Sequence, residues 1–549
     1  MIFNFFGSLK AETKNHGILP DSHEERIFRR FVLLVYIIVA SANIITHEMW
    51  RDELQHWLIA TNSNSILELF CNLKNNGHPP LWNLMLYAIS RVTHNPVAMQ
   101  YLHLIIAIAV VYVFLRFAPF SRLQRLLFVF GYFPLYEYAA ISRNYGIGMF
   151  LLFWFCAACG AARKNLFILS LILLLLGMAN AYTFIITVCL LAALGFKAAT
   201  NPDTRAVLIR RKWTILLCTA IVVLGLAASA AVMSPKSDCL WGSKSWTKTF
   251  KAELLSQTAA TVWKGLVPIP QLTLCYWDTN IVPQLSLQGI MGVVLLCFLL
   301  LSTANNRTVF LFFSLSIAAM LVFEYVVYMG GLRHFGHFFI IVIVCLWLEK
   351  VWGEDKRFDS AHHGPIKAVR QGSPQAGFMT VLSRLCARGR PILRYATKGR
   401  QWLVMILLVV HFAVGIFASV MEWRYPFSQG KNAARYIREK GLDKLPTVGY
   451  QDFAASTVAG YLDRQFYYPN SDTFGTFVVF DSKRKMFMGA DEVLESARLL
   501  AERNSSDVLL VLCLEIGGTE GVVTELKRFT DSLQGEENFY LYLLKYKGR

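Results

Sequence analysis

Long apolar runs, most of them near the length needed to cross a bilayer, recur along the chain up to residue 420. A transmembrane helix needs about 20 mostly apolar residues. Arginine and lysine collect in alternate loops between these runs, which places those loops in the cytoplasm. The pattern predicts a polytopic α-helical membrane protein with about 11 transmembrane helices. We expect these helices at 31–47, at 97–115, in a run ending at 132, in a run ending at 163, and at 166–179, 182–196, 213–232, 285–303, 308–328, 331–349 and 401–420.

From Tyr425 onward the pattern becomes that of a soluble α/β domain. Helical periodicity predicts helices at 432–440 and 490–503, and short apolar or alternating segments predict four strands. We expect the strands at 447–450, 476–481, 507–514 and 539–546. The predicted organisation is a cytoplasmic N-terminus (1–30), a membrane module (31–349) with outer loops 47–96 and 233–284, a basic, flexible cytoplasmic loop (350–400), a last transmembrane helix (401–424) and an extracytoplasmic domain (425–549).

Composition agrees with this topology. Of 549 residues, 55% are hydrophobic and 16% are charged, which is typical of a multi-pass protein. The net charge of +18 does not indicate nucleic-acid binding, because the basic residues collect in inter-span loops. No cleavable signal is visible in residues 1–20, so we expect the first span to target the chain to the inner membrane.

Charged and aromatic residues gather at the expected outer ends of the spans. Asp52 and Glu53 follow the first span, and two amphipathic segments, after Asp52 and at 81–92, are expected along the membrane interface. His78-Pro79-Pro80-Leu81-Trp82 follows in the same loop. Further along the chain, Glu137 lies between two tyrosines and Arg143 precedes Asn144-Tyr145. Carboxylates at a membrane exit are either solvated loop residues or functional ones.

This order of motifs resembles the GT-C superfamily of polyprenyl-phosphate-sugar glycosyltransferases. The similarity is to the branch that holds protein O-mannosyltransferases and the aminoarabinose transferase that modifies lipid A. The motifs cover about residues 31–200, and the rest of the chain is similar only in architecture. One departure is Asn144, where the family has proline after the arginine.

The resemblance implies a membrane glycosyltransferase that moves a sugar from a polyprenyl-phosphate donor to a glycolipid, polysaccharide or protein acceptor. It places the catalytic acid at Asp52, with Glu53 as the alternative and Glu137 as a second acid. Asp52 leaves the first span where apolar spans meet outer water, so we expect partial desolvation to raise its pKa. Glu53 could instead be an acid that favours a helix N-terminus, and Glu137 could be a loop acid paired with Arg143. We expect His56, His78, Arg143, Tyr145, Arg333 and His334 to bind substrate, with Arg333 clamping the phosphate. Arg333 could also be an interfacial anchor, and His78 a solvated turn residue.

Metal binding stays open at this stage. His47, Glu48, Asp52, His56 and His78 offer enough ligands for zinc or manganese, but their spacing matches no tight zinc pattern. Cys239 and Cys275 share an outer loop and are expected to form a disulfide. The tryptophans of that loop (241, 246, 263 and 277) are expected to form an interfacial belt.

Two other functions remain possible from the residues alone. A transporter or flippase for a lipid-linked sugar would be expected to show broken spans and an internal repeat, whereas these spans are mostly uninterrupted. A non-catalytic envelope assembly factor would use the outer α/β domain as its working part.

Overall fold

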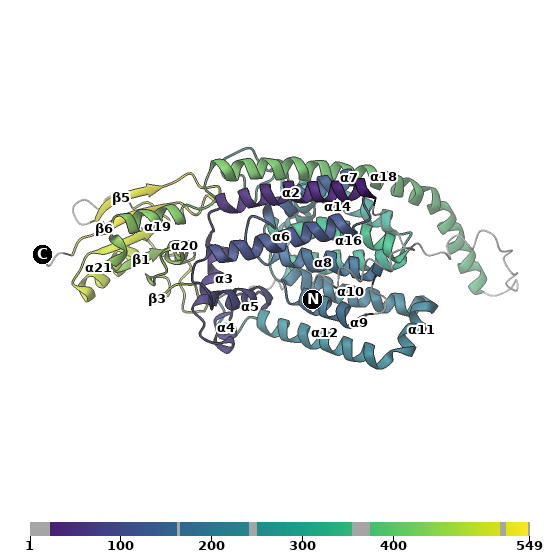
Figure 1. Cartoon of the computed structure of the whole chain (residues 1–549), viewed down its shortest axis with the longest axis horizontal. Coiled ribbons are helices and arrows are strands. Elements are labelled where there is room, and N and C mark those ends of the chain that lie inside the picture. The colour runs from purple at the N-terminus through teal and green to yellow at the C-terminus, as the bar shows by residue number, and fades with distance from the viewer. Residues whose placement is uncertain (1–21, 162–164, 241–249, 354–373, 517–522, 547–549) are drawn as a thin grey trace.

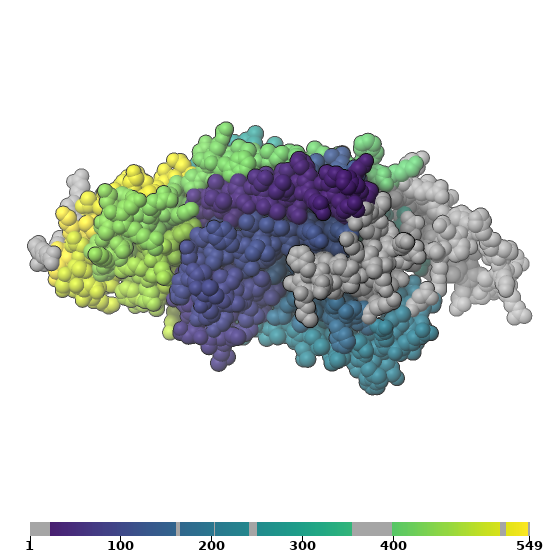
Figure 2. All heavy atoms as spheres, viewed as in Figure 1, coloured from purple at the N-terminus to yellow at the C-terminus, as the bar shows by residue number. Residues whose placement is uncertain are grey.

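A long helical bundle makes up most of the molecule, and a smaller α/β domain lies at one end of it (Figure 1 and Figure 2). The computed structural model describes residues 22–161, 165–240, 250–353, 374–516 and 523–546, with only the backbone described for 374–397. The predicted fold class, a polytopic α-helical membrane protein with a C-terminal α/β domain, is confirmed.

Eight helices in the described part of the chain are long and apolar enough to cross a membrane. Apolar side chains such as Phe31, Ile105 and Leu224 stay exposed on them, as expected for helices surrounded by lipid. The eight are α2 (His23–Thr46), α6 (Val97–Phe117), α10 (Ala181–Thr200), α12 (Lys212–Met233), α14 (Leu285–Thr303), α15 (Arg307–Val326), α16 (Leu332–Trp352) and the Lys398–Arg424 part of α18 (Pro374–Arg424).

Three of the expected spans are shorter than the other eight. The expected third span, which ends at residue 132, forms α7 (Arg122–Val129), and one π-helical turn, η2 (Phe133–Glu137), follows it. Such turns often occur at functional sites, and Pro134 supplies no backbone N–H for regular α-helical bonding. The fourth and fifth spans are α8 (Tyr145–Ala161) and α9 (Leu166–Gly177).

Three short helices occupy the expected outer loop 47–96. They are α3 (Arg51–Thr61), α4 (Ile66–Asn72) and α5 (Leu81–Ser90). The expectation that the segment after Asp52 lies along the membrane surface is wrong, because residues 53–60 are buried and α3 packs between α5 and the C-terminal domain. The remaining described helices before the C-terminal domain are α11 (Pro202–Arg210) and α13 (Ala252–Leu266), of which α13 packs against α14 and α16.

The C-terminal domain is a six-stranded mixed sheet with helices on both faces. Strand order is β3-β2-β1-β4-β6-β5, with β1 parallel to β2 and β4 and the other pairs antiparallel. The strands are β1 (Thr447–Tyr450), β2 (Phe466–Tyr468), β3 (Thr473–Gly475), β4 (Val508–Leu512), β5 (Val523–Phe529) and β6 (Phe539–Leu544). The helices are α19 (Gly430–Glu439), η4 (Leu442–Lys444), α20 (Asp452–Leu462) and α21 (Ala490–Asn504).

Alternation along β4 builds a core on each face of this sheet. Leu509 and Val511 pack with α19 and α20, whereas Val508, Leu510 and Leu512 pack with α21. Successive strand residues point to opposite faces, so one continuous apolar strand serves both cores. Both predicted helices and the strands near 447–450, 507–514 and 539–546 are confirmed.

Three expectations about the outer segments and the long loop are corrected. Residues 476–481 form no strand; Asp481 instead makes an isolated bridge with Cys239. Within the expected flexible loop, residues 354–373 lie outside the described part of the chain, and the backbone from 374 onward is already the start of α18.

The expected disulfide is absent, because Cys239 and Cys275 are both free. Cys239 is held at Asp481, whereas the thiol of Cys275 donates to the carbonyl of Ser532 at 3.7 Å. The two cysteines of one outer loop are thus attached to different parts of the C-terminal domain.

Candidate functional site

Glu53 fixes the start of α3. Its carboxylate is fully buried and accepts hydrogen bonds from the backbone N–H of Trp50 at 3.1 Å and of Ser142 at 2.6 Å. The first of these is the helix-capping bond of an acid in the first turn. Nε2 of His47 lies 2.8 Å from the same carboxylate. Glu53 therefore joins three segments of the bundle and faces away from its neighbour Asp52.

His47 connects this anchor to the last membrane helix. Nδ1 of His47 lies 3.0 Å from Glu422 of α18, while Nε2 contacts Glu53. Burial lowers the pKa of His47, but the two carboxylates outweigh burial and raise the pKa well above its usual value. The result is a buried Glu53–His47–Glu422 bridge with a charged imidazole at its centre.

Asp52 points to the other side of α3 and meets two arginines. Its Oδ2 lies 3.3 Å from Nη1 of Arg143 and 3.2 Å from Nη2 of Arg333. Both arginine side chains are mostly buried, whereas the carboxylate is about one quarter exposed (26%). The structure therefore brings together three predicted site residues from three separate segments of the chain.

The charge state of Asp52 differs from what its place at a membrane exit suggests. A partly desolvated carboxylate there is expected to have a raised pKa. Burial does raise the pKa of Asp52, but the charges of Arg143 and Arg333 outweigh burial and hold the pKa well below its usual range. The expectation of a raised pKa is wrong for this arrangement, since the sequence cannot show both arginines on one carboxylate.

Arg143 is held by a tightly packed loop between η2 and α8. Its Nη1 donates to the carbonyl of Asp52 at 2.5 Å, and its own carbonyl lies 2.9 Å from Nε2 of His103. Gly146 is required by this packing, because a Cβ there would lie 2.7 Å from the carbonyl of Tyr138. The loop therefore has little freedom to move the guanidinium.

Arg333 lies in the first turn of α16. Asp278 starts this helix by accepting the backbone N–H of Leu332 at 2.6 Å. The guanidinium carbon of Arg333 lies 5.4 Å from the ring centre of Trp50 and 5.5 Å from that of Trp277. Such cation–π contacts stabilise a charge that is partly removed from water. The indoles hold the guanidinium beside Asp52.

His56 and His78 form the next layer around Arg143. Nε2 of His78 lies 3.4 Å from Nη2 of Arg143, and the two imidazole centres are 5.0 Å apart. Burial and then the charge of Arg143 lower the pKa of His78 to about 3, and the pKa of His56 is also well below its usual value for these reasons. Both rings are therefore neutral and polar at physiological pH. Nδ1 of His56 is held by Asn83 at 3.0 Å.

Tyr145 and His334 complete the predicted set. The hydroxyl of Tyr145 lies 2.8 Å from Nε2 of His334, and Arg143 lies over the Tyr145 ring at 6.0 Å. Nδ1 of His334 accepts the backbone N–H of Gly331 at 2.9 Å, which leaves Nε2 to meet the tyrosine. All six predicted substrate-binding residues are thus connected to the Asp52 cluster by direct contacts.

Glu137 is buried close to the cluster without joining it directly. Its Oε2 accepts hydrogen bonds from Tyr132 at 2.7 Å and from Nε1 of Trp277 at 3.0 Å, while Oε1 has no hydrogen-bond partner in the described structure. Burial raises the pKa of Glu137 to about 7, against the lowering effect of the Tyr132 and Trp277 hydrogen bonds. Trp277 links it to Arg333, whose guanidinium lies over the same indole.

No group of three or more histidine, cysteine, aspartate or glutamate side chains that could hold a metal ion occurs among the described residues. In the cluster the Asp52 carboxylate faces two guanidinium groups, and Nδ1 of His56 is bound to Asn83. The side chains that the sequence suggests as metal ligands thus contact different protein groups.

Several functional neighbours were missed by sequence reasoning. Trp277 was assigned to a membrane-interface belt, but it lies at the site between Trp50, Glu137 and Arg333. The sequence signal for this position was the neighbouring acid, Asp278, whose carboxylate accepts the first backbone N–H of α16. Trp241 and Trp246 lie outside the described residues. Trp50 and Glu422 carried no signal beyond their place at a span end.

Comparison with known proteins gives fold-level similarity only. No protein-family model and no curated protein matches the chain. Similar solved structures include ArnT from Cupriavidus metallidurans bound to undecaprenyl phosphate (TM-score 0.46) and the same protein in the apo state (TM-score 0.43). Each is 11% identical over 93% of this chain and 97% of the other. ArnT is the lipid A aminoarabinose transferase, whose branch the sequence resembles. Because both TM-scores are below 0.5, the proposal below rests on this chain's own residues.

Proposed function

We propose that the protein is a membrane glycosyltransferase that takes a sugar from a polyprenyl-phosphate-linked donor and passes it to an acceptor hydroxyl. The acceptor is a glycolipid, a polysaccharide or a protein. The motif resemblance, with Asp52, His78 and Arg143 at the outer ends of the spans, implies a lipid-phosphate donor of this kind. The site lies at the end of the bundle where the C-terminal domain sits, which we place on the outer side of the inner membrane.

One observation carries this proposal: two buried arginines converge on a single, partly exposed carboxylate. A guanidinium presents a planar fork of donors that fits phosphate and carboxylate oxygens alike. The Asp52 carboxylate therefore occupies the position at which an anionic phosphate would be bound. Nε of both arginines also lacks a hydrogen-bond partner in the described structure.

Donor binding would change the basicity of Asp52. The two positive charges hold its pKa low, and a bound phosphate would neutralise them. The carboxylate would then become a better proton acceptor at the moment when the donor is in place. A base that acts on an acceptor hydroxyl must lie within hydrogen-bond reach of it, and the exposed quarter of Asp52 offers that access.

The reaction follows from these roles. The acceptor oxygen attacks the anomeric carbon and its proton passes to Asp52. The bond from that carbon to the phosphate oxygen breaks, and its electron pair stays on the phosphate, where Arg143 and Arg333 stabilise the charge. Attack opposite the leaving phosphate inverts the anomeric configuration. The neutral imidazole of His78, next to Arg143, can hydrogen-bond the sugar or the phosphate without adding charge.

Glu137 and Glu53 take supporting roles in this proposal. Oε1 of Glu137 has no partner in the described structure, which makes it the second acid that could position the acceptor. All the contacts of Glu53 are to the protein's own backbone and His47, so it positions α3.

The test is turnover of purified protein with a labelled polyprenyl-phosphate sugar and a panel of acceptors. Release of polyprenyl phosphate together with a labelled acceptor supports the transferase. Uptake of the intact donor into vesicles without its cleavage would favour a transporter. Saturable binding with neither would favour an assembly factor. A variant with Arg143 and Arg333 both changed to glutamine should lose all donor-dependent signals.

A further inference from the structure

Glu324 is a buried acid that the proposed reaction does not use. It lies in the last turn of α15, on the face that packs into the bundle, and the residue is only 1% exposed. Other buried positions of this face include Phe312, Ile317 and Met320. An ionisable side chain inside a membrane helix is costly and is a functional candidate by default, so its partners indicate what it does.

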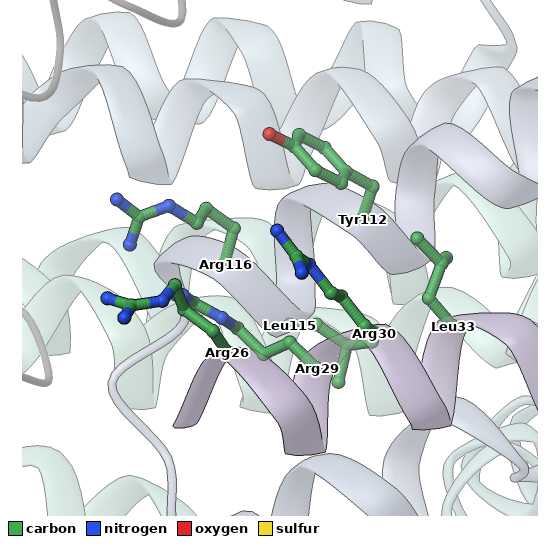
Figure 3. Close-up of a pocket in the computed structure, with 7 residues that line it drawn as sticks. All are labelled: Arg26, Arg29, Arg30, Leu33, Tyr112, Leu115 and Arg116. Atoms are coloured by element: carbon green, nitrogen blue, oxygen red, sulfur yellow. The ribbon is translucent and has the colours of Figure 1, made fainter. Parts of the chain in front are cut away.

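Arginines near the start of α2 and the end of α6 show the more usual arrangement for charge on a span. Arg26 and Arg30 border a hollow there and are exposed, and Arg116 is half-buried (Figure 3). Long cationic side chains reach water in this way while their stems stay against apolar surface. The shorter, buried side chain of Glu324 does not reach water, so the protein itself must satisfy its two oxygens.

Two hydroxyl groups satisfy the Glu324 carboxyl. The hydroxyl of Tyr182 on α10 donates to Oε1 at 3.2 Å, and Oγ1 of Thr261 on α13 lies 2.6 Å from Oε2. Oγ1 of Thr261 also lies 2.7 Å from the carbonyl of Thr258. A carbonyl only accepts, so the single hydroxyl hydrogen of Thr261 points at Thr258. The hydrogen between Thr261 and Glu324 must then come from the carboxyl, which makes Glu324 a neutral acid.

Tyr182 connects this acid to His334. The Tyr182 ring is buried, and its centre lies 5.4 Å from that of the His334 ring. Tyr145 and Tyr328 meet the same imidazole edge-on, each with 5.4 Å between ring centres. Three tyrosines thus enclose His334, and the bond to Glu324 fixes one of them.

The orientation of His334 decides what Tyr145 can donate. Nδ1 of His334 accepts the backbone N–H of Gly331 at 2.9 Å, so this nitrogen carries no hydrogen and Nε2 does. Nε2 donates to the hydroxyl oxygen of Tyr145 at 2.8 Å. The hydroxyl hydrogen of Tyr145 is therefore not used by His334 and can be donated to an oxygen near Arg143, whose guanidinium lies over the same ring. Hydrogen bonds in a chain polarise one another, so the bond from Nε2 strengthens the one that Tyr145 donates.

We propose that Glu324, as a neutral acid, is a positioning residue for the phosphate of the sugar donor. It fixes Tyr182 behind His334, and His334 in turn sets Tyr145 to donate its hydroxyl hydrogen to a phosphate oxygen beside Arg143. This role rests on the proposed function, because it assumes a phosphate at the two arginines. An acid with a purely structural role would affect folding alone, whereas a positioning acid also sets the affinity for the sugar donor.

The experiment compares Glu324→Gln with Glu324→Ala in the full chain in detergent. Glutamine has the shape of the neutral acid: its amide N–H can donate to Thr261 and its carbonyl can accept from Tyr182. Glu324→Gln should therefore keep the wild-type KM for the sugar donor. Glu324→Ala removes both bonds and should raise that KM by roughly tenfold or more, with the KM for the acceptor unchanged.

Two further variants and a spectrum complete the design. Tyr182→Phe keeps the ring but loses the hydroxyl, so it should raise the KM for the sugar donor less than Glu324→Ala does. Ser316→Ala, which removes another buried polar group from α15, is the matched control and should change neither KM. Thermal unfolding checks that each variant folds. The infrared difference spectrum between wild type and Glu324→Gln should contain the carbonyl band of a protonated carboxylic acid.

The outcomes separate this inference from the proposed function. If wild type binds polyprenyl phosphate but transfers no sugar, the transferase proposal fails, and the affinities of the same variants for polyprenyl phosphate test Glu324. If wild type does not bind polyprenyl phosphate, both proposals fail. A loss in Glu324→Gln as large as in Glu324→Ala would overturn the neutral acid, as would a difference spectrum with carboxylate bands only. Unchanged affinity in a folded Glu324→Ala, or in Tyr182→Phe where Glu324→Ala does not fold, would overturn the positioning role.

Discussion

Asp52 and Arg333, distant in the sequence, form an ion pair with 3.2 Å between Oδ2 and Nη2. The pair joins the first turn of α3 to the first turn of α16. Helix α3 also packs against α20 of the C-terminal domain. Arg143 approaches the same oxygen at 3.3 Å. Both arginines could bind a phosphate instead. In this structure the Asp52 carboxylate is the anion that they bind.

Replacing Asp52 by asparagine tests the base. Asp52→Asn keeps the shape of the side chain but removes its basicity, so turnover should fall by about 10²-fold or more. Donor binding should stay the same or become tighter, because the carboxylate no longer competes for Arg143 and Arg333. Labelled-donor binding and turnover are measured on the same preparation. Near-normal turnover in this variant together with an inactive, folded Glu53→Gln would move the base to Glu53.

The phosphate clamp is tested by Arg333→Lys. A lysine ammonium is a point charge and cannot reproduce the fork, so donor affinity should fall by roughly tenfold or more. Arg91→Lys, at the end of α5, serves as the control with the same chemistry away from the cluster. Unchanged donor affinity in both Arg333→Lys and Arg333→Ala would make Arg333 an anchor only.

The sequence singles out the residues that the structure brings together, but it does not predict their connections. Asp52, Arg143 and Arg333 stand out because charge at a membrane exit is costly. The sequence carries no information on which of two adjacent acids faces the arginines. That choice depends on the helical turn that directs Glu53 toward Ser142 and His47. The pKa of Asp52 was predicted with the wrong sign for the same reason.

Some elements of the fold were likewise predicted from the sequence and others were missed. Long apolar runs predicted α6 and α14 to within two residues at each end, since length and hydropathy alone decide them. The break between α7 and η2 was missed, because periodicity does not register a π-helical turn. Strand β5 and helix α20 were also missed. The alternating polar face of β5 lies at a sheet edge, where few residues are buried.

Membrane topology gives a separate prediction. Single cysteines introduced at Asp472 in the C-terminal domain and at Asn305 between α14 and α15 should label from opposite sides of the membrane. Asp472 should react with an impermeant reagent in intact cells, and Asn305 only after permeabilisation. Cysteines in the 350–400 segment should behave like Asn305. Labelling of that segment in intact cells would reverse the orientation and remove the site from the outer side.

Glu137 should make stability depend on pH. Its pKa is raised to about 7, so the folded state holds this proton more tightly than the unfolded state, whose value is about 4.3. The stabilisation is complete below pH ~4.3 and is lost as pH rises to about 7. Glu137→Gln mimics the protonated form and cannot lose a proton. The unfolding free energy of Glu137→Gln minus that of wild type should therefore rise by on the order of 2 kcal/mol between pH 5 and pH 8.

Thermal and denaturant unfolding of the detergent-solubilised protein measures this difference at each pH. Glu502→Gln, at an exposed position on α21, is the control and should show no such trend. If the difference in unfolding free energy between Glu137→Gln and wild type does not change with pH, the raised pKa of Glu137 is contradicted.

The C-terminal domain contacts the start of α3 through Glu537. This residue is fully buried, and its Oε1 accepts the backbone N–H of Arg51 at 2.8 Å, directly beside Asp52. Its Oε2 accepts the hydroxyl of Ser428 at 2.5 Å. Glu537→Ala would leave these buried donors without an acceptor, at a cost of about 1–3 kcal/mol for each.

Hydrogen exchange over residues 51–61 should therefore rise in Glu537→Ala, and turnover should drop several-fold because Asp52 is no longer held beside its arginines. The neighbouring acid supplies the control. Glu536 contacts the Arg51 side chain at 2.6 Å but is 68% exposed, and exposed ion pairs contribute about 0–1 kcal/mol. Glu536→Ala should thus leave both exchange and turnover nearly unchanged. Equal effects of the two variants would mean that surface charge, and not the buried contact, couples the domain to α3.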